Sequence, residues 1–386
     1  MENPTAKLLA LVCALLVAAC ATPPVGSQTE TLFNDRLFHA PSERINADDV
    51  FAVSDDMQQF LQRGLAGHLR SSDSRAALID AIYIKGQLKL EYDSTTTRNA
   101  AQAFAARSGN CLSLVIMTAA FARLMGLPFQ FQSVYVDDAV NRRDDFLFFI
   151  GHVNLTLAPR QSILKHRDVP NLMTVDFLPP EETQGLRIRV LGEQTIVAMY
   201  MNNRAAEALA AGNVDDAYWW ARAAVRQDPE FVSAYNTLGV VYRRHGNPNE
   251  AEKVLAYALE RDPRNTRVVA NLIRVLSDLG QVANAQALTR RLELLEPEPP
   301  YSYFDPGLQA MRDHDYKTAR DLFAKEVARA PFDHEFHFWL ASAYAGLGDV
   351  EQARRQMQLA LAYSSSRGDH ELYAAKLDRI RASQPH

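Results

Sequence analysis

Hydrophobic and polar positions divide the chain into a helical segment, a strand-rich segment and a second, longer helical segment. Apolar residues recur at helical spacing from Val50, and a strongly apolar helix is expected from Cys111 to about Met125. Breaker residues at 107–110 precede that helix, and Gly126 is expected to close it. Strand-like patterns then cover four segments: 129–136, 146–157, 173–178 and 186–191. Helices followed by successive strands predict an α+β domain with an antiparallel sheet over residues 49–194.

The chain from Thr195 onward has a helical pattern throughout and carries an internal repeat of 34 residues. Prolines, glycines and alanines keep this register: Pro229, Pro263, Pro297 and Pro331; Gly212, Gly246, Gly280 and Gly348, with His314 in the remaining slot; Ala217, Ala251, Ala285, Ala319 and Ala353. Small residues let paired helices approach closely, and each proline ends a second helix. The pattern resembles the tetratricopeptide repeat (TPR).

This resemblance implies about five repeats over residues 195–365, stacked into an all-α solenoid, with a capping helix and tail over 366–386. The concave groove of such a solenoid is expected to bind a peptide or a protein partner. Pro299, Pro300 and Pro306 stand near the start of the fourth repeat, so its first helix is expected to be short or displaced. A helical solenoid of another type is the alternative.

The N-terminus combines Lys7 with an apolar run over residues 8–19 that is too short to span a membrane as a mature helix. The run ends in Val-Ala-Ala before Cys20, which resembles the bacterial lipobox. This implies a signal peptide over 1–19, a lipid on Cys20 and a tether over 20–48. The absence of Asp after Cys20 resembles the outer-membrane default, so the expected location is the periplasmic face of the outer membrane in the cell envelope. An ordinary cleaved signal or a short anchor helix is the alternative.

Charge and cysteine content narrow the classes of partner and chemistry. The 41 basic and 46 acidic side chains give a net charge of −5, which argues against nucleic acid as the main partner. With Cys13 inside the signal and Cys20 as the lipid site, Cys111 is the only mature cysteine and has no disulfide partner in the chain. No cofactor or metal is expected. His334 and His337 have i, i+3 spacing where metalloprotease helices need i, i+4, and they are interpreted as surface residues.

Cys111 stands where a thiol can be activated, at the start of an apolar helix. The first N–H groups of a helix are unpaired and its dipole is positive there, which favours a thiolate and can bind an oxyanion. A thiolate nucleophile also needs a general base and a group that orients the base. His152 and Asp176 are polar residues inside two successive apolar segments, and neighbouring strands can place both side chains on one face above the helix N-terminus.

These residues and their neighbours resemble the transglutaminase-like superfamily over roughly residues 50–192. The similarity lies in Gly-Asn-Cys-Leu-Ser-Leu at 109–114 with the helix that follows, in Gly-His-Val around His152 and in Val-Asp-Phe around Asp176, in that order. It implies a papain-like fold, in which a helix packs on an antiparallel sheet. It also implies that Cys111 is the nucleophile, His152 the base and Asp176 the orienting acid.

Two features depart from the superfamily pattern. Leu112 and Ser113 follow the nucleophile, where aromatic or acidic residues are often found. No residue is assigned as the side-chain oxyanion donor. Gln130, Gln132 and Tyr135 are candidates, and strand alternation puts Tyr135 on the opposite face from the two glutamines.

Two functions from different classes follow. In the first, the protein is an envelope lipoprotein whose Cys-His-Asp thiol domain acts on amide bonds, while the TPR array binds a peptide or protein. The thiol domain is then a peptidase or amidase, or transfers the acyl group to an amine; hydrolysis is preferred because water is the default acceptor. In the second, the protein is a non-catalytic assembly lipoprotein with an inactive transglutaminase-like binding module and an inert core Cys111. A Cys111 sulfur within about 4 Å of a His152 ring nitrogen favours the first function.

Overall fold

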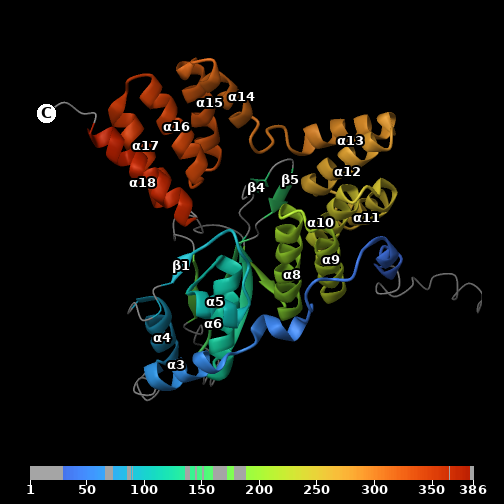
Figure 1. The fold of residues 1–386 in the computed structure, drawn as a ribbon, viewed down its shortest axis with the longest axis vertical. Coiled ribbons are helices and arrows are strands. Elements are labelled where there is room, and N and C mark those ends of the chain that lie inside the picture. The colour runs from blue at the N-terminus through green and yellow to red at the C-terminus, as the bar shows by residue number, and fades with distance from the viewer. Residues whose placement is uncertain are drawn as a thin grey trace, which may run out of the picture.

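The computed structural model shows an α+β region that continues directly into a long array of paired helices (Figure 1). The structure describes residues 29–65, 73–84, 88, 90–134, 140–143, 146–149, 152–159, 172–177, 188–364 and 366–382. The predicted signal peptide and lipid site, residues 1–20, lie outside these ranges. Within them, no helix combines the length and the apolar character that a membrane span requires.

The α+β region contains several short helices, one long apolar helix and a mainly antiparallel set of strands. Its helices are η1 (Asp35–Leu37), η2 (Ala47–Phe51), α3 (Asp55–Leu65), α4 (Ser74–Ile79), the π-helical turn η3 (Asp80–Ile84), α5 (Ala100–Ala106) and α6 (Cys111–Leu124). Its strands are β1 (Glu91–Tyr92), β2 (Ser108–Gly109), β3 (Phe129–Val134), β4 (Val140–Arg143), β5 (Phe146–Phe149), β6 (His152–Leu157), β7 (Met173–Val175) and β8 (Ile188–Leu191). The main sheet has the order β7-β6-β3-β8, with every neighbouring pair antiparallel.

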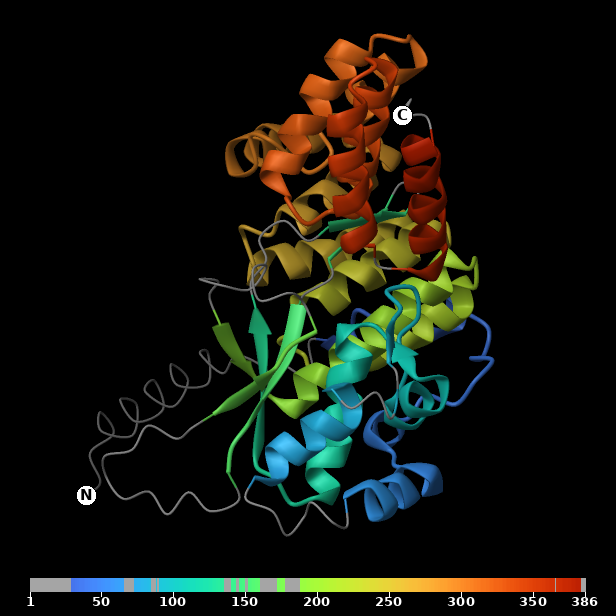
Figure 2. The ribbon, with the colours of Figure 1, turned by 90° about the vertical axis from the view of Figure 1, so that its left-hand side faces the viewer.

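Helix α6 packs beside the main sheet and forms the centre of this region (Figure 2). Every residue from 111 to 122 is buried, which is why the helix has apolar residues on all sides. The helix ends before Gly126, whose φ of 64° allows the left-handed turn expected there. The alternate β6 residues Val153, Leu155 and Leu157 are fully buried in the same apolar cluster.

The strand prediction differs from the structure in several places. The short strands β1 and β2, which pair in parallel, lie outside the four predicted segments, and β7 ends before Asp176. The predicted apolar run 146–157 contains two strands, β5 and β6. Residues 137–145, which lie between two of the predicted strand segments, contain β4, which pairs with β5 in an antiparallel hairpin. The charged composition of β4 concealed this strand, because its pairing depends on the apolar strand that follows and not on its own residues.

The array consists of antiparallel helix pairs followed by a terminal helix. Its helices are α8 (Glu193–Ala210), α9 (Val214–Gln227), α10 (Val232–Arg244), α11 (Pro248–Arg261), α12 (Thr266–Asp278), α13 (Val282–Leu295), α14 (Phe304–Arg312), α15 (Tyr316–Arg329), α16 (His334–Gly346), α17 (Val350–Ala362) and α18 (Arg367–Ala382). The helix pairs follow the predicted register of 34 residues. Helix α14 has 9 residues, so the first helix of the fourth pair is short, as the prolines near its start predicted.

The turn inside each helix pair needs a left-handed backbone. Four glycines have φ between 70° and 84° at this position: Gly212, Gly246, Gly280 and Gly348. His314 takes the same conformation between α14 and α15, with φ 60°, so the register continues there without a glycine. Close packing fixes another glycine, because a Cβ added at Gly239 would lie 2.5 Å from the Leu255 side chain on the paired helix.

Packing divides the array into two stacks. The apolar cluster of the α+β region continues through α8–α12, and its last buried member is Ala285 on α13. Two separate clusters lie in the chain from Tyr301 onward. Between Ala285 and Tyr301, Leu294 is 84% exposed, and a proline-rich segment leads into α14. We call α8–α13 the first stack and α14–α18 the second stack (Figure 1).

Residues 29–46 form a strap on the first stack, although a tether was expected over 20–48. Phe38 stacks on Tyr218 of α9 with ring centroids 3.9 Å apart, and the Tyr218 hydroxyl donates a 2.6 Å hydrogen bond to Asp35. The described part of the predicted tether is therefore folded. The sequence interpretation missed this because Asp35 and Tyr218 are 183 residues apart in the chain.

The prediction that His337 lies on the surface is wrong. The residue is 3% exposed, and its ring nitrogens lie 2.6 Å from the Gln356 side-chain oxygen and 2.8 Å from the Pro331 carbonyl oxygen. His337 therefore ties α16 to α17 inside the second stack. Across the part of the chain that the structure describes, no three His, Cys, Asp or Glu side chains are grouped to hold a metal ion.

Candidate thiol site

Cys111 is the first residue of α6, and the residues around it fix where the helix starts. The Asn110 side chain accepts a 2.9 Å hydrogen bond from the Ser113 N–H and so caps the helix. Gly109 is required by packing, since a Cβ there would lie 2.7 Å from the Cβ of Ser113. Cys111 is 3% exposed and lies at the positive end of the helix dipole.

The structure brings the three predicted residues together. His152 begins β6, and its Nε2 lies 2.6 Å from Oδ1 of Asp176, which directly follows β7 and is not within a strand. Cys111 lies close enough to His152 for its side chain to raise the pKa of the histidine. The antiparallel pairing of β6 with β7, in which Leu155 lies opposite Val175, sets the Asp176 carboxylate beside the His152 ring.

The hydrogen bonds define how His152 is protonated. A carboxylate only accepts hydrogen bonds, so Nε2 of His152 is protonated and its N–H donates a hydrogen bond to Asp176. Nδ1 is then the ring nitrogen that can exchange a proton with the thiol. Burial lowers the pKa of His152, but the hydrogen bonds to Asp176 and Cys111 and the attraction of their negative charges outweigh it and raise that pKa to about 9. A cationic ring beside sulfur is the arrangement that stabilises a thiolate.

Asn154 is a fourth member of the site, and the sequence interpretation missed it. Its Nδ2 donates a 3.0 Å hydrogen bond to Oδ2 of Asp176, so His152 and Asn154 each hold one oxygen of the carboxylate. Asn154 is 3% exposed, and its own Oδ1 has no partner among the described residues. A signal was present in the sequence: His152 and Asn154 alternate with apolar residues and therefore share one face of β6.

The glutamines considered as oxyanion donors lie on β3, which pairs with β6. Gln132 is half-buried and lies opposite Asn154, whereas Gln130 is exposed and lies opposite Thr156. His152 lies opposite Val134, so Gln132 is the nearer of the two glutamines to His152 along the sheet. Tyr135, the third candidate, lies outside the described residues.

Several solved structures are similar to part of this chain. The MamA protein is 21% identical, over 45% of this chain and 93% of that one, with a TM-score of 0.26. YrrB, a TPR protein with an unusual peptide-binding site, is 22% identical over 47% and 92%, with a TM-score of 0.25. A thermophilic TPR protein of Thermus thermophilus is 19% identical over 47% and 98%, with a TM-score of 0.29. No curated protein matches the chain.

Two family models described as tetratricopeptide repeat match the array. One covers residues 242–304, and the other covers residues 202–266 and 304–369. The matches span both stacks and follow the helix pairs of the structure. The predicted repeats are therefore confirmed: residues 202–369 of this chain carry tetratricopeptide repeats.

Proposed function

We propose that this protein is an envelope lipoprotein in which a transglutaminase-like thiol domain acts on amide bonds and the TPR array binds a peptide or protein. The observation that carries the proposal is the 2.6 Å hydrogen bond between His152 and Asp176, together with the position of Cys111 at the start of α6, where its side chain raises the pKa of His152. A nucleophile, a base and an orienting acid in this arrangement are what thiol acyl transfer needs. The packing of α6 beside an antiparallel sheet supports a papain-like fold.

The first half-reaction breaks the amide bond. The Cys111 thiolate attacks the carbonyl carbon of the substrate and forms a C–S bond, while an electron pair moves onto the carbonyl oxygen. The His152 imidazolium gives its Nδ1 proton to the leaving nitrogen as the C–N bond breaks. The products are a free amine and a thioester on Cys111. Asp176 keeps the ring oriented during this step because its carboxylate holds Nε2.

The second half-reaction consumes the thioester. Neutral His152 takes a proton from an incoming water, the water oxygen bonds to the carbonyl carbon, and the C–S bond breaks to release a carboxylic acid and the thiolate. An amine in place of the water gives acyl transfer. We favour hydrolysis, because water needs no binding site of its own.

The start of α6 also supplies donors for the oxyanion. The Ser113 N–H is taken by Asn110, whereas the N–H groups of Cys111 and Leu112 have no partner in the part of the chain that the structure describes. Unpaired N–H groups at the positive end of a helix stabilise a tetrahedral oxyanion. Gln132 on β3 is the candidate for an additional side-chain donor.

The array supplies the proposed binding surface. Stacked TPR helices form an extended concave face, and an exposed groove of this kind takes a peptide segment or part of a protein. Helix α8 begins two residues after β8 ends, so a ligand on the first stack is held close to the α+β region. The array would thereby present a substrate to the thiol site or bring the site to its target.

Lipid on Cys20 is the proposed membrane attachment, and the periplasmic face of the outer membrane is the proposed location. The apolar run that ends in Val-Ala-Ala-Cys supports both. The described structure begins at residue 29, so eight residues, 21–28, separate the lipid site from it. Eight residues span at most about 28 Å, which would keep the first stack near the bilayer surface.

The proposal is tested with the chain from Thr22 to His386, which contains every described residue and has Cys111 as its only cysteine. The rate of alkylation by iodoacetamide is measured across pH for this chain, for His152→Ala and for the control His370→Ala on the surface of α18. Fast alkylation well below the free-thiol pKa of about 8.5, slowed only by His152→Ala, supports the proposal. A free-thiol profile that His152→Ala leaves unchanged overturns it.

A non-catalytic scaffold is the second function, and one observation favours it. Cys111 and His152 are 3% and 4% exposed, and Cys111 belongs to the main apolar cluster. The thiol region would then be a binding module, and the array would assemble other proteins. Amine release from peptides or peptidoglycan fragments, lost in Cys111→Ser, supports the enzyme. Binding of a protein to the array without such release, together with a free-thiol profile, supports the scaffold.

A further inference from the structure

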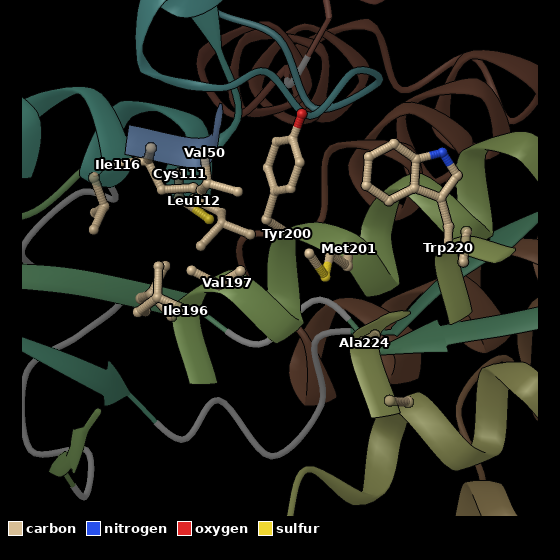
Figure 3. Close-up of a cluster of buried hydrophobic side chains, with 14 of the residues drawn as sticks. Val50, Cys111, Leu112, Ile116, Ile196, Val197, Tyr200, Met201, Trp220 and Ala224 are labelled. Carbon is tan, nitrogen blue, oxygen red and sulfur yellow. The ribbon is translucent and has the colours of Figure 1, made fainter. Parts of the chain in front are cut away.

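The candidate thiol site and the first repeat helix share one apolar core. Figure 3 shows residues of α6 and α8 in a single cluster: Cys111, Leu112 and Ile116 with Ile196, Val197, Tyr200 and Met201. Ile196 is fully buried, and the predicted domain boundary at residue 194 falls inside α8. The first repeat helix is therefore built into the α+β region as well as into the array.

A chain of polar contacts runs beside this core from the start of α6 to α8. Asn110, whose Oδ1 caps α6, donates from Nδ2 to the Thr97 hydroxyl at 2.8 Å. Asn203 of α8 donates to the same hydroxyl at 3.3 Å. The Thr97 N–H donates to Oε1 of Glu207, also on α8, at 2.6 Å. Thr97 is 2% exposed, so these hydrogen bonds are shielded from water and stronger than bonds at the surface.

The Glu207 carboxylate is itself held by charge. Arg204 lies one turn earlier on α8 and contacts this carboxylate at 3.1 Å. The same guanidinium reaches Glu43 of the strap at 2.9 Å. The segment that contains Thr97 is also tied to α6 directly, because the Arg98 N–H donates to the Ser113 hydroxyl at 2.8 Å. The strap, α8 and the start of α6 thus meet around one buried threonine.

We propose that α8 positions the candidate nucleophile: Asn203 and Glu207 fix Thr97, and Thr97 fixes the Asn110 side chain that caps α6 at Cys111. Asn203 and Glu207 are positioning residues, because they act through the cap and do not touch the reacting atoms. The inference rests on the proposed function, since its main effect is read at the Cys111 thiol. If α8 positions the cap, the first repeat is part of the thiol site. A ligand that moves α8 would then also change the position and reactivity of the Cys111 thiol.

Matched variants in the chain from Thr22 test the Thr97 hydroxyl, which both Asn110 and Asn203 contact, and the Glu207 carboxylate. Thr97→Val removes the hydroxyl and keeps the shape of the side chain, whereas Thr97→Ser keeps the hydroxyl. Glu207→Ala removes the acceptor of the Thr97 N–H, whereas Glu207→Gln keeps an acceptor oxygen. Each variant is compared with the parent chain by its melting temperature, its Cys111 alkylation rate across pH and the amide exchange rate of Ser113. Exchange at Ser113 reports the cap directly, because that N–H donates to Asn110.

Thr97→Val and Glu207→Ala are expected to slow alkylation below pH 8.5 by about three- to fivefold and to speed Ser113 exchange by a similar factor, the size of a lost helix cap. Thr97→Ser and Glu207→Gln are expected to stay within about twofold of the parent chain. This pattern supports the inference. An equal loss in Thr97→Ser and Thr97→Val indicates a general packing defect and overturns it.

The two proposals fail in different ways. If the parent chain alkylates fast in a His152-dependent manner, while Thr97→Val and Glu207→Ala change neither rate, the inference fails and the proposed function stands. If the parent chain has a free-thiol profile, the proposed function fails, and Ser113 exchange alone decides whether α8 fixes the start of α6. If Glu207→Ala does not fold, the comparison of Thr97→Val with Thr97→Ser tests the inference.

Discussion

The two stacks of the array have the same repeat pattern and different relations to the rest of the molecule. The first stack shares its apolar core with α6 and carries the strap. The second stack has two buried clusters of its own, one around Phe304, Phe323 and Phe336 and one around Met357, Tyr373 and Leu377. The repeat register runs through both without a shift. A repeat register therefore specifies helix pairs, whereas the packing between pairs specifies which of them act as one unit.

The difference has a local cause at α13. A repeat stacks on the next one when its second helix buries an apolar face. In α13 the buried residue is Ala285, which is small, whereas Val282 and Leu294 are 60% and 84% exposed. The segment with Pro297, Pro299 and Pro300 then redirects the chain before α14. The first stack is thus an extension of the thiol region, and the second stack is a separate module joined to it.

The largest expected effect separates the two stacks. Phe323→Ala deletes a fully buried ring from its cluster in the second stack and is expected to cost about 3–5 kcal/mol of unfolding free energy there. Because the cluster around Phe323 is separate from the core of the first stack, amide exchange should accelerate in α14–α16, while exchange in α8–α12 and Cys111 alkylation stay unchanged. Hydrogen exchange followed by mass spectrometry measures both stacks in one sample. Acceleration in α8–α12 as well would show that the stacks unfold as one unit.

A change of pH is expected to alter the stability of the α+β region and of the first stack, which shares its core. The pKa of His152 is about 9 in the folded protein against 6.5 for an ordinary histidine, so the folded chain holds a proton that the unfolded chain has lost. This stabilisation is complete below pH 6.5 and disappears as pH rises to 9, a loss of about 3 kcal/mol.

Urea denaturation below pH 6.5 and above pH 9, read by limited proteolysis of each stack, measures this pH effect. His152→Ala should remove the pH dependence of the α+β region and the first stack, and the second stack should show little change in either protein. Equal stability of the wild-type first stack at both pH values would contradict the role assigned to the His152–Asp176 pair.

Asn154→Ala tests the residue that holds the second oxygen of Asp176. A hydrogen bond to a charged group contributes about 1.5–3 kcal/mol, so the variant should lose that much stability. A less restrained Asp176 should also orient His152 less well, and Cys111 alkylation at low pH should slow by less than in His152→Ala. Asn271→Ala is the matched control, since Asn271 is another buried asparagine that donates one side-chain hydrogen bond, to Asn236 in the first stack. It should lower stability and leave alkylation unchanged.

The parts of the fold that could be predicted are those encoded by neighbours in the sequence. The helix pairs follow from prolines, turn glycines and apolar spacing, and α6 follows from its cap at Asn110 and its apolar run. The strap and β4 could not be predicted from composition. Phe38 is ordered by Tyr218, and β4 by β5, so in both cases the partner and not the segment decides the structure.

The residues of the candidate site also fall into those that the sequence could predict and those that it could not. Cys111, His152 and Asp176 could be predicted together because each is a polar or reactive residue in an apolar segment, in the order of the transglutaminase-like pattern. The structure places each of them at the end of its element and not inside it. Asn154 could have been added from its alternation with His152 on one strand. Thr97 and Glu207 could not be found, because they lie in a loop and in a repeat helix, and only the packing of α8 against α6 brings them to the cap.

The smallest expected effect concerns the charged edge of the strap. Arg226 of α9 forms two hydrogen bonds to the Glu30 carboxylate and holds the pKa of that carboxyl below its usual value. Both side chains are about half exposed, and exposed ion pairs contribute about 0–1 kcal/mol and weaken in salt. Glu30→Gln should therefore lower the stability of the first stack by no more than this, and by less at high salt.

Thermal unfolding at low and high salt measures the change, with Glu351→Gln, which removes a surface pair with Arg354 in the second stack, as the control. The two substitutions should give similarly small losses, each confined to its own stack. A loss well above 1 kcal/mol in Glu30→Gln alone would mean that the strap is held by its charges and not by the stacking of Phe38 on Tyr218. The stability of the first stack would then fall with ionic strength, while that of the second stack would not. Added salt would in that case distinguish the two stacks as clearly as Phe323→Ala does.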